Sequence, residues 1–518
     1  MAQVSLTAVN KIFWDYLPAE IRLMILEILL QDGCSLASFA TVSREWQTII
    51  ERHNFAQIKL TPSCLDDFDS MLRRNRALVD CIWLCIELEE YDCTACAPED
   101  PEGSMVSETD NELVATALED LFEDLSAWEP NGQLLLDISV YSPSDSEHWF
   151  KYLTFEPDTP SDECGRGCVE QAIQAKAHDH KHSWVSGSRD SAPDPMAIDK
   201  LFEQIMDQGP FGTDEQEDEW WQELPAIPAV TGVLLRQQNR RRWKPKALAQ
   251  MFSRLPRLRE IHYEPWREWN RTFQMWTDKS YRFLFESLSS SKLQRLVIFE
   301  NFNQQYPPGL RNYEPIQTPT FAVSQMVANA SLKLEHLAAS FMVDASYFFQ
   351  AREPSWLWPK LTSLVLTSRL LTPDRSPTDI NDMLQAAAET AMKMPKLETM
   401  EIWNGRVGLA TLFRYQSVGA RRPAVVTWRG TWGLDLEPSV IRAWEAVALE
   451  HGGDGSTIVK ELLGAGSVIK SHGDAIHYLK ISKPVIRPVS LQQIRLEHNI
   501  RGVQQRDRIP VDMTGNPS

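Results

Sequence analysis

The stretch Leu17-Pro18-Ala19-Glu20-Ile21-Arg22-Leu23-Met24-Ile25-Leu26-Glu27-Ile28-Leu29-Leu30 decides how the N-terminal part of this chain is organised. Pro18 is compatible with the first turn of a helix, where the N–H that proline lacks would have no partner. Only three charged residues interrupt the apolar ones, so the predicted helix is apolar on more than one face. The residues up to about position 55 are too few to cover such a helix as an independent core. We therefore expect one face to pack locally and another to bind a partner protein.

The residues after this helix follow a distinctive order. A break at Asp32-Gly33 precedes a second helix from Ser35, a third helix around Trp46 and a short strand over Phe55–Leu60. The order Leu-Pro-x-Glu-Ile, apolar helix, Ser-Leu, Val-Ser-Arg-x-Trp and Phe-x-x-Ile-x-Leu resembles the F-box over about 45 residues. The resemblance implies docking on the Skp-type adaptor of cullin–RING ubiquitin ligases, while the rest of the chain selects a protein substrate. An ordinary helical hairpin within a larger core is the alternative. The adaptor-binding residues are predicted to be Leu17, Pro18, Ile21, Met24, Ile25 and Leu29.

Length and composition indicate a globular protein of more than one unit. The chain has 518 residues, of which 43% are hydrophobic, and this length exceeds what one simple core accommodates. No apolar run approaches the roughly 18 residues of a membrane span, and Met1–Asn10 lacks the basic and apolar regions of a signal peptide. Eight cysteines without regular pairing fit a reducing compartment. We therefore expect a cytoplasmic or nuclear protein, or one present in both, without a membrane partner.

Acidic residues are concentrated in one part of the chain. The net charge is −19, and the stretch between Arg76 and Lys151 holds 19 acidic residues but no Lys or Arg. A chain with this charge is not expected to bind nucleic acid. Two interpretations of the acidic stretch stay open: a solvated face, or a surface for a basic partner.

A helix-then-strand unit recurs through the rest of the chain. The phrase Leu-x-x-apolar-x-x returns several times, usually after a predicted helix, and resembles the strand entry of leucine-rich repeats. Its spacings of 35, 41, 27 and 36 residues are irregular, whereas true repeats run about 20–29. The predicted fold class is α/β, with a three-helix F-box followed by an irregular leucine-rich-repeat-like α/β solenoid. A conventional doubly wound α/β domain is the alternative. The phrases begin at Leu258, Leu293, Leu334, Leu361 and Leu397.

The chain is divided into six predicted segments. Residues 141–221 are rich in Ser, Asp, Pro and Gly and interrupt the helix–strand rhythm, which predicts a mobile insertion. Pro423–Trp428 and Ala475–Ile481 are predicted to be the last strands, with a helix over Pro438–Glu450. Residues 236–269 are similar to the C-terminal region of a family of uncharacterised fungal F-box proteins, which supplies no known substrate. The segments are an N-terminal tail (1–10), the F-box (11–55), the first acidic helix–strand repeats (56–140), the mobile acidic insertion (141–221), the degenerate leucine-rich-repeat-like substrate domain (222–485) and a C-terminal tail (486–518).

Aromatic residues at predicted strand ends are the candidate substrate-binding residues. Strand ends carry ligand sites in α/β architectures, and aromatic and Arg side chains suit protein recognition. The competing interpretation is that the aromatic side chains pack between the repeats, since large aromatics dominate core burial. The predicted substrate-binding residues are Trp266, Trp269, Phe302, Phe341, Arg369 and Trp403.

Metal and catalytic chemistry are not expected. Cys164, Cys168, His178 and His182 have a spacing that could close a tetrahedral zinc site, but their central gap is short and a His-rich loop with free thiols is favoured. Cys93-Thr94-Ala95-Cys96 is interpreted as a coincidental Cys-x-x-Cys. There is no nucleophile elbow or phosphate-binding loop, so we predict no enzyme, no cofactor and no metal.

The basic run Arg236–Lys246 stands between a predicted strand and a predicted helix. A structured loop is therefore favoured over a nuclear-localisation signal. Together these features predict the substrate-recognition subunit of an SCF-type ubiquitin ligase, which binds the Skp-type adaptor and through it a cullin. A non-degradative scaffold that uses the hairpin only for assembly is the alternative.

Overall fold

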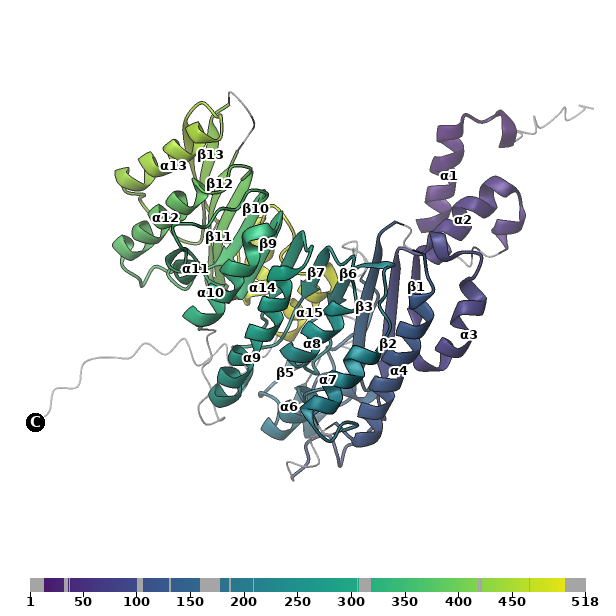
Figure 1. The fold of residues 1–518 in the computed structure, drawn as a ribbon. Coiled ribbons are helices and arrows are strands. Elements are labelled where there is room, and N and C mark those ends of the chain that lie inside the picture. The colour runs from purple at the N-terminus through teal and green to yellow at the C-terminus, as the bar shows by residue number, and fades with distance from the viewer. Residues whose placement is uncertain are drawn as a thin grey trace, which may run out of the picture.

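The computed structural model is a mixed α/β protein built on one long sheet (Figure 1). The coarse prediction of an α/β fold is therefore confirmed. The structure describes residues 14–31, 36, 38–99, 106–129, 132–158, 178–185, 188–207, 209–304, 306, 318–417, 419, 422–464 and 466–498.

The sheet has twelve strands, and their order across the sheet follows their order along the chain. Neighbouring strands are parallel except at the antiparallel pairs β11–β12 and β12–β13. Parallel neighbours need a crossover connection, which explains the helix before most strands. The strands are β1 (Gln57–Leu60), β2 (Cys81–Glu87), β3 (Leu134–Tyr141), β6 (Val230–Leu235), β7 (Glu260–Tyr263), β8 (Arg295–Phe299), β9 (His336–Asp344), β10 (Ser363–Thr367), β11 (Thr399–Arg406), β12 (Leu409–Gln416), β13 (Ala424–Gly430) and β14 (Ser456–Leu462).

The repeated leucine phrase marks where strands begin. Each of its five leading leucines is buried and lies two residues before the first residue of β7, β8, β9, β10 or β11. Inside the strands the apolar positions are in register, since Leu337 lies opposite both Leu296 and Leu364. Rows of apolar side chains therefore run across the parallel sheet and form the main core.

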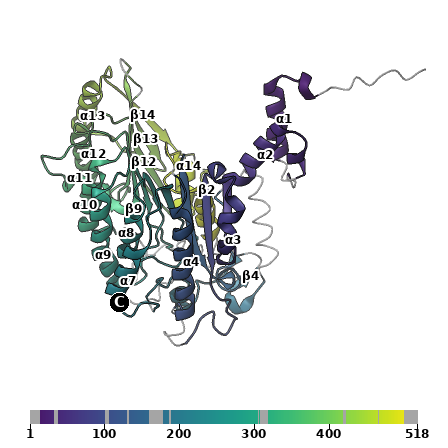
Figure 2. The same ribbon diagram turned by 45° about the vertical axis from the view of Figure 1, so that its right-hand side comes forward.

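Helices cover one face of the sheet along its whole length (Figures 1 and 2). Their apolar sides pack on the apolar rows of the strands, as expected for a parallel sheet with buried faces. These helices are α3 (Pro62–Leu72), α4 (Glu108–Ser126), α7 (Asp214–Glu223), α8 (Pro245–Ser253), α9 (Arg271–Ser290), α10 (Phe321–Ala330), α11 (Ala345–Gln350), α12 (Pro377–Ala391) and α13 (Pro438–Glu450), with short 3-10 turns η3 (Arg76–Leu78) and η7 (Ser331–Lys333).

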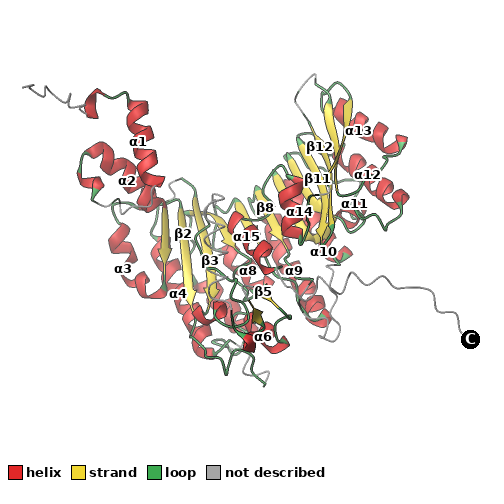
Figure 3. Cartoon of the chain, turned by 180° about the vertical axis from the view of Figure 1, so that it is seen from behind, coloured by secondary structure: helices red, strands yellow, loops and turns green. Residues whose placement is uncertain are grey.

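A second, smaller layer covers part of the opposite face (Figure 3). Of its two C-terminal helices, α14 packs on β11 and β12 and α15 packs beside α14, and its other elements come from the connection between β3 and β6. The layer consists of η5 (Pro143–Ser146), η6 (His180–His182), the two-stranded sheet of β4 (Trp184–Val185) and β5 (Ser188–Arg189), α6 (Pro195–Leu201), α14 (His472–Leu479) and α15 (Pro488–Glu497).

This second layer corrects three predictions. Residues 475–479 belong to helix α14 and not to a strand, because the side chain of Ser471 accepts a hydrogen bond from the N–H of Asp474 and caps a helix there. The predicted C-terminal tail 486–518 begins with α15, whose Ile494 is fully buried. The predicted mobile insertion 141–221 contributes buried Tyr152 and Trp184 to a packed core, although its residues 159–177 lie outside the described residues.

The N-terminal segment forms a helical hairpin that projects beyond strand β1 (Figures 1 and 3). It consists of η1 (Trp14–Tyr16), α1 (Ala19–Gln31), η2 (Phe39–Thr41) and α2 (Arg44–Ala56), and α2 leads directly into β1. The side chain of Ser43 accepts a hydrogen bond from the N–H of Trp46 and caps α2. Among the helices of the described ranges, none combines the length and the apolar character that crossing a bilayer requires.

Candidate functional site

The hairpin has a small interior of its own. Leu26 of α1 and Ile50 of α2 are each only 1% exposed. At its outer end the rings of Trp14 and Trp46 lie 5.0 Å apart, and Trp14 Nε1 donates to Glu45 Oε2 at 2.9 Å. The hairpin is therefore held together by few contacts, which leaves most of the apolar surface of α1 uncovered.

The uncovered apolar residues of the hairpin form a candidate interface. Ile21, Met24 and Ile28 follow helical spacing on α1 and expose 42%, 55% and 57% of their surface. Several large apolar side chains exposed to water on one short helix indicate a binding site for another protein. We call this set the hairpin face, and its members are Ile21, Leu23, Met24, Ile28, Phe39 and Val42.

The predicted adaptor-binding residues divide between this face and its edge. Pro18, Ile21 and Met24 are exposed, whereas Leu17, Ile25 and Leu29 are half-buried. Leu23, Ile28, Phe39 and Val42 were not among the predicted residues, although Ile28 lies four residues after Met24 and helical spacing alone would have identified it.

The predicted aromatic substrate residues occupy a different environment. Trp266 and Trp269 are buried against Phe202 and Tyr306. Phe302, Phe341 and Trp403 are buried in a second cluster beneath α14 and α15. These aromatic side chains therefore do not form the exposed surface that was expected. The C-terminal helices cover the second cluster, and the connection between β3 and β6 covers Trp266 and Trp269.

Arg369 is the partly exposed member of that predicted set. Its backbone N–H donates to Asp344 Oδ2 at 2.9 Å, and its guanidinium lies over the ring of Tyr347, 4.8 Å from the ring centroid. It also donates to the hydroxyl of Tyr347. Arg369 is thus engaged within the fold, and the structure does not group it with the five aromatic residues.

Residues 236–241 of the basic run are buried, and its remaining basic residues are half-buried. Arg236 lies 2.9 Å from Asp137, Arg241 lies 2.5 Å from Asp145, and both pairs are almost fully buried. Burial raises the pKa of Asp137 to about 6, although the guanidinium of Arg236 favours its charged form. The favoured interpretation of this run as a structured loop is confirmed, and two of its partners come from the acidic stretch 76–151.

A groove beside α9 is the candidate surface that the sequence did not reveal. It has a volume of about 770 Å³ and is lined by residues of α6, α7, α8 and α9 and of the adjacent loops. Phe273, Trp276 and Phe283 lie on one side of α9 and are exposed by 49%, 57% and 42%. Their spacing of three and seven residues was a usable signal, since Tyr281, Leu284 and Leu288 form the buried side of the same helix. We call this feature the α9 groove.

The lining of the α9 groove carries an excess of acidic groups. Its three basic side chains, Arg242, Lys244 and Lys246, form ion pairs with Glu268, Glu217 and Asp218. Further carboxylates complete the lining, and burial raises the pKa of two of them, Asp199 and Glu203. Trp269 is the predicted substrate residue that also lines this groove. The further acidic lining residues are Asp199, Glu203, Asp207 and Asp214.

The zinc-like spacing in the sequence is not reproduced as a cluster among the described residues. Cys164 and Cys168 lie outside those residues. The ring of His178 packs against His180 with centroids 4.6 Å apart, whereas His182 lies beside Cys93 and Cys96.

Comparisons with known proteins give one partial match. Residues 287–487 match the model of a family of unknown function, DUF6546. This region runs from the end of α9 to the segment before α15 and includes β8 to β14. The comparisons with curated proteins and with solved structures gave no match.

Proposed function

We propose that this chain is the substrate-recognition subunit of an SCF-type cullin–RING ubiquitin ligase and that its N-terminal hairpin is an F-box. The observation that carries the proposal is the exposed hairpin face, on a segment whose order of residues resembles the F-box. Its occupant would be the Skp-type adaptor, and the adaptor would connect the chain to a cullin. On this proposal the chain recognises a substrate, and the ligase transfers ubiquitin.

The body of the molecule supports a receptor role. Strands in sequential order, with helices along one face, are the arrangement of leucine-rich-repeat proteins. We therefore propose that the sheet and its helices form an irregular repeat array of that kind. An extended array offers a long surface for a protein substrate at a distance from the adaptor-binding end.

We propose the α9 groove as the substrate-binding surface. A lining that combines exposed aromatic side chains with an excess of carboxylates suits a protein segment that has apolar anchor residues flanked by Lys or Arg. This assignment replaces the exposed aromatic surface expected at the strand ends and keeps Trp269 as a member of the lining.

Adaptor binding is tested by charge substitutions on the hairpin face. The double variant Ile21→Asp/Met24→Asp is expected to weaken co-purification of the Skp-type adaptor by at least about tenfold, because buried charges would be introduced into an apolar interface. Leu449→Asp is the matched control, because Leu449 is 57% exposed on α13, at the other end of the sheet. Full adaptor binding by the double variant would contradict the F-box assignment.

A second measurement separates the ligase from a scaffold. If the purified complex contains both adaptor and cullin, the receptor role is supported. If it contains the adaptor without a cullin, the non-degradative scaffold is the correct function.

The substrate surface is tested with Trp276→Asp and Phe283→Asp. Proteins that accumulate with the wild-type chain when the proteasome is inhibited should be depleted by at least about tenfold with these variants, while adaptor binding is unchanged. Retention of the same proteins by both variants would remove the α9 groove from the proposal.

A further inference from the structure

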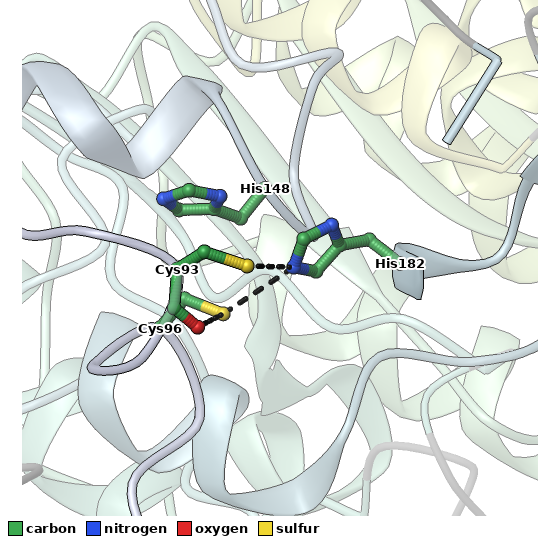
Figure 4. A group of neighbouring side chains, drawn as sticks. All are labelled: Cys93, Cys96, His148 and His182. Atoms are coloured by element: carbon green, nitrogen blue, oxygen red, sulfur yellow. Dashed lines mark hydrogen bonds between the residues drawn. The ribbon is translucent and has the colours of Figure 1, made fainter. Parts of the chain in front are cut away.

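Four potential metal ligands converge where strands β2 and β3 end (Figure 4). They are Cys93, Cys96, His148 and His182, and one ligand atom from each lies within 4.8 Å of those of the other three. Cys96 and His182 are buried, and Cys93 and His148 are half-buried. The residues come from three segments of the chain: Cys93 and Cys96 share one turn, and His148 and His182 each lie on another segment. Cys93 and His182 are 89 positions apart.

Local structure holds each segment in place. Asp92 Oδ1 accepts hydrogen bonds from the N–H groups of Thr94 and Ala95, at 2.8 and 3.3 Å, and so shapes the Cys-x-x-Cys turn. The carbonyl of His148 accepts a hydrogen bond from Trp184 Nε1 at 3.1 Å. Backbone hydrogen bonds of 2.9 Å in both directions between Asp179 and Trp184 close the turn that carries His182.

The imidazole of His182 is oriented as a zinc ligand requires. Its Nδ1 lies 2.7 Å from Asp179 Oδ2, and Lys151 Nζ contacts the same carboxylate oxygen at 3.0 Å. With the proton on Nδ1, the lone pair of Nε2 faces the sulfur atoms of Cys93 and Cys96, at 3.3 and 3.4 Å. A carboxylate that orients a histidine in this way is the usual support of a zinc-bound imidazole.

The hydrogen bonds of the described residues do not use every polar atom of this cluster. Nε2 of His148 is buried and has no hydrogen-bond partner among the described residues. Both cysteines are free thiols. In a tetrahedral zinc site with bond lengths of about 2.0–2.3 Å, neighbouring ligand atoms lie roughly 3.3–3.8 Å apart. The separations from His182 Nε2 to the two sulfur atoms fall in that range.

We propose that Cys93, Cys96, His148 and His182 bind one structural Zn²⁺. Two thiolates and two neutral imidazoles are a donor set that zinc prefers, and four protein ligands leave no open position for catalysis. Binding releases the two thiol protons, so the positive charge of the ion is balanced by the two thiolates. The ion would join the turn after β2, the segment after β3 and the turn before β4. It would thereby fasten the second layer to the sheet.

Metal analysis of the purified full chain tests the site. We expect one zinc per chain in the wild type and loss of zinc in Cys96→Ser and in His148→Ala. Cys85→Ser is the matched control, because Cys85 is a buried thiol on β2 outside the cluster. The variants Cys164→Ser and Cys168→Ser should keep the zinc. Zinc that is lost with these two changes but kept in Cys96→Ser would overturn the proposal.

Cobalt binding can be measured on the wild-type protein, so this test does not require a variant to fold. Wild-type protein stripped with a chelator and loaded with Co²⁺ should give visible bands of tetrahedral cobalt with sulfur-to-metal charge transfer from two thiolates. Stripping should also lower the midpoint of thermal unfolding by about 5 °C or more, and zinc should restore it. Zinc-free protein that binds no Co²⁺, or a Cys93–Cys96 disulfide in the purified reduced protein, would overturn the proposal.

Discussion

The hairpin face and the strand-end aromatic residues show how the same type of side chain can take opposite positions in one molecule. Met24 of the hairpin is 55% exposed, whereas Trp403 at the far part of the sheet is completely buried. Both were expected to bind partner proteins. The difference is that α14 packs on β11 and β12 and, together with α15, covers the cluster that holds Trp403, whereas no described element packs over the hairpin face. An apolar residue is therefore a binding residue only where the rest of the fold leaves it open.

Deleting α15 and deleting the hairpin should have the largest effects on unfolding, and the two effects should be unequal. A chain that ends at residue 486 lacks α15, which buries Val489, Ile494 and Glu497, and we expect it to lose cooperative unfolding. A chain that lacks residues 14–56 should keep a cooperative transition, although it loses adaptor binding. Thermal unfolding followed by circular dichroism measures both. Equal damage from the two deletions would show that the hairpin is part of the main core.

The charge network under α15 sharpens the comparison at single-residue level. Glu497 is buried, contacts Arg240 at 3.1 Å and accepts hydrogen bonds from the hydroxyls of Tyr152 and Tyr306. Glu497→Ala would leave a buried guanidinium without its counter-charge, and we expect a loss of about 3–5 kcal/mol in the free energy of unfolding. Urea titration measures the loss. Glu461→Ala is the control, because Glu461 pairs with Arg429 at the surface, and should change stability by less than about 1 kcal/mol.

Substitution of a buried and of an exposed tryptophan by alanine gives a matched comparison of stability. Trp403→Ala should lower the free energy of unfolding by about 3–5 kcal/mol, because it removes a fully buried aromatic side chain. Trp276→Ala should change it by less than about 0.5 kcal/mol, because Trp276 is 57% exposed. If both variants lose the same stability in urea titration, the α9 groove is a packing interface and not an open surface.

The smallest expected effect is a pH dependence of stability that arises from the burial of one carboxyl group. Burial raises the pKa of Glu300 to about 8, against about 4.3 in an unfolded chain. Between these values the folded state holds a proton that the unfolded state has released, so this group's contribution to stability falls as the pH rises. Glu300→Gln should therefore unfold at a higher temperature than wild type at pH 8, and the gap should narrow at pH 5. A gap that is equal at both pH values would contradict this account.

Much of the sheet could be predicted from the sequence, because its signals are local and periodic. The leucine phrases predicted the starts of β7 to β11, and the helix Pro438–Glu450 has the predicted bounds. Residues 475–481 were assigned to a strand because a short apolar run has no period long enough to separate a strand from a helix. β12 was missed because the chain there turns back into an antiparallel pair, a change that the repeated helix–strand rhythm does not predict.

The candidate sites were predictable to different degrees. The part of the hairpin face on α1 follows from helical spacing within 14 residues, Leu17 to Leu30, whereas Phe39 and Val42 lie beyond that stretch. The part of the second layer between β3 and β6 was mistaken for a mobile insertion because its composition is polar, although a few apolar residues such as Phe150 and Trp184 are sufficient to pack it. The cluster around His182 could not be predicted, because spacing rules compare ligands that are near in sequence and these come from three segments.

The burial of Glu497 near the end of the described chain has a consequence for synthesis on the ribosome. Arg240 is translated more than 250 residues before its counter-charge, since the two positions are 257 apart. The nascent chain therefore carries the guanidinium of Arg240 without its counter-charge until α15 has left the exit tunnel, and the second layer cannot be completed earlier. A prematurely terminated product would expose this charge together with the aromatic residues that α14 and α15 cover. Such a product would present the features by which chaperones and proteases distinguish incomplete chains from finished ones.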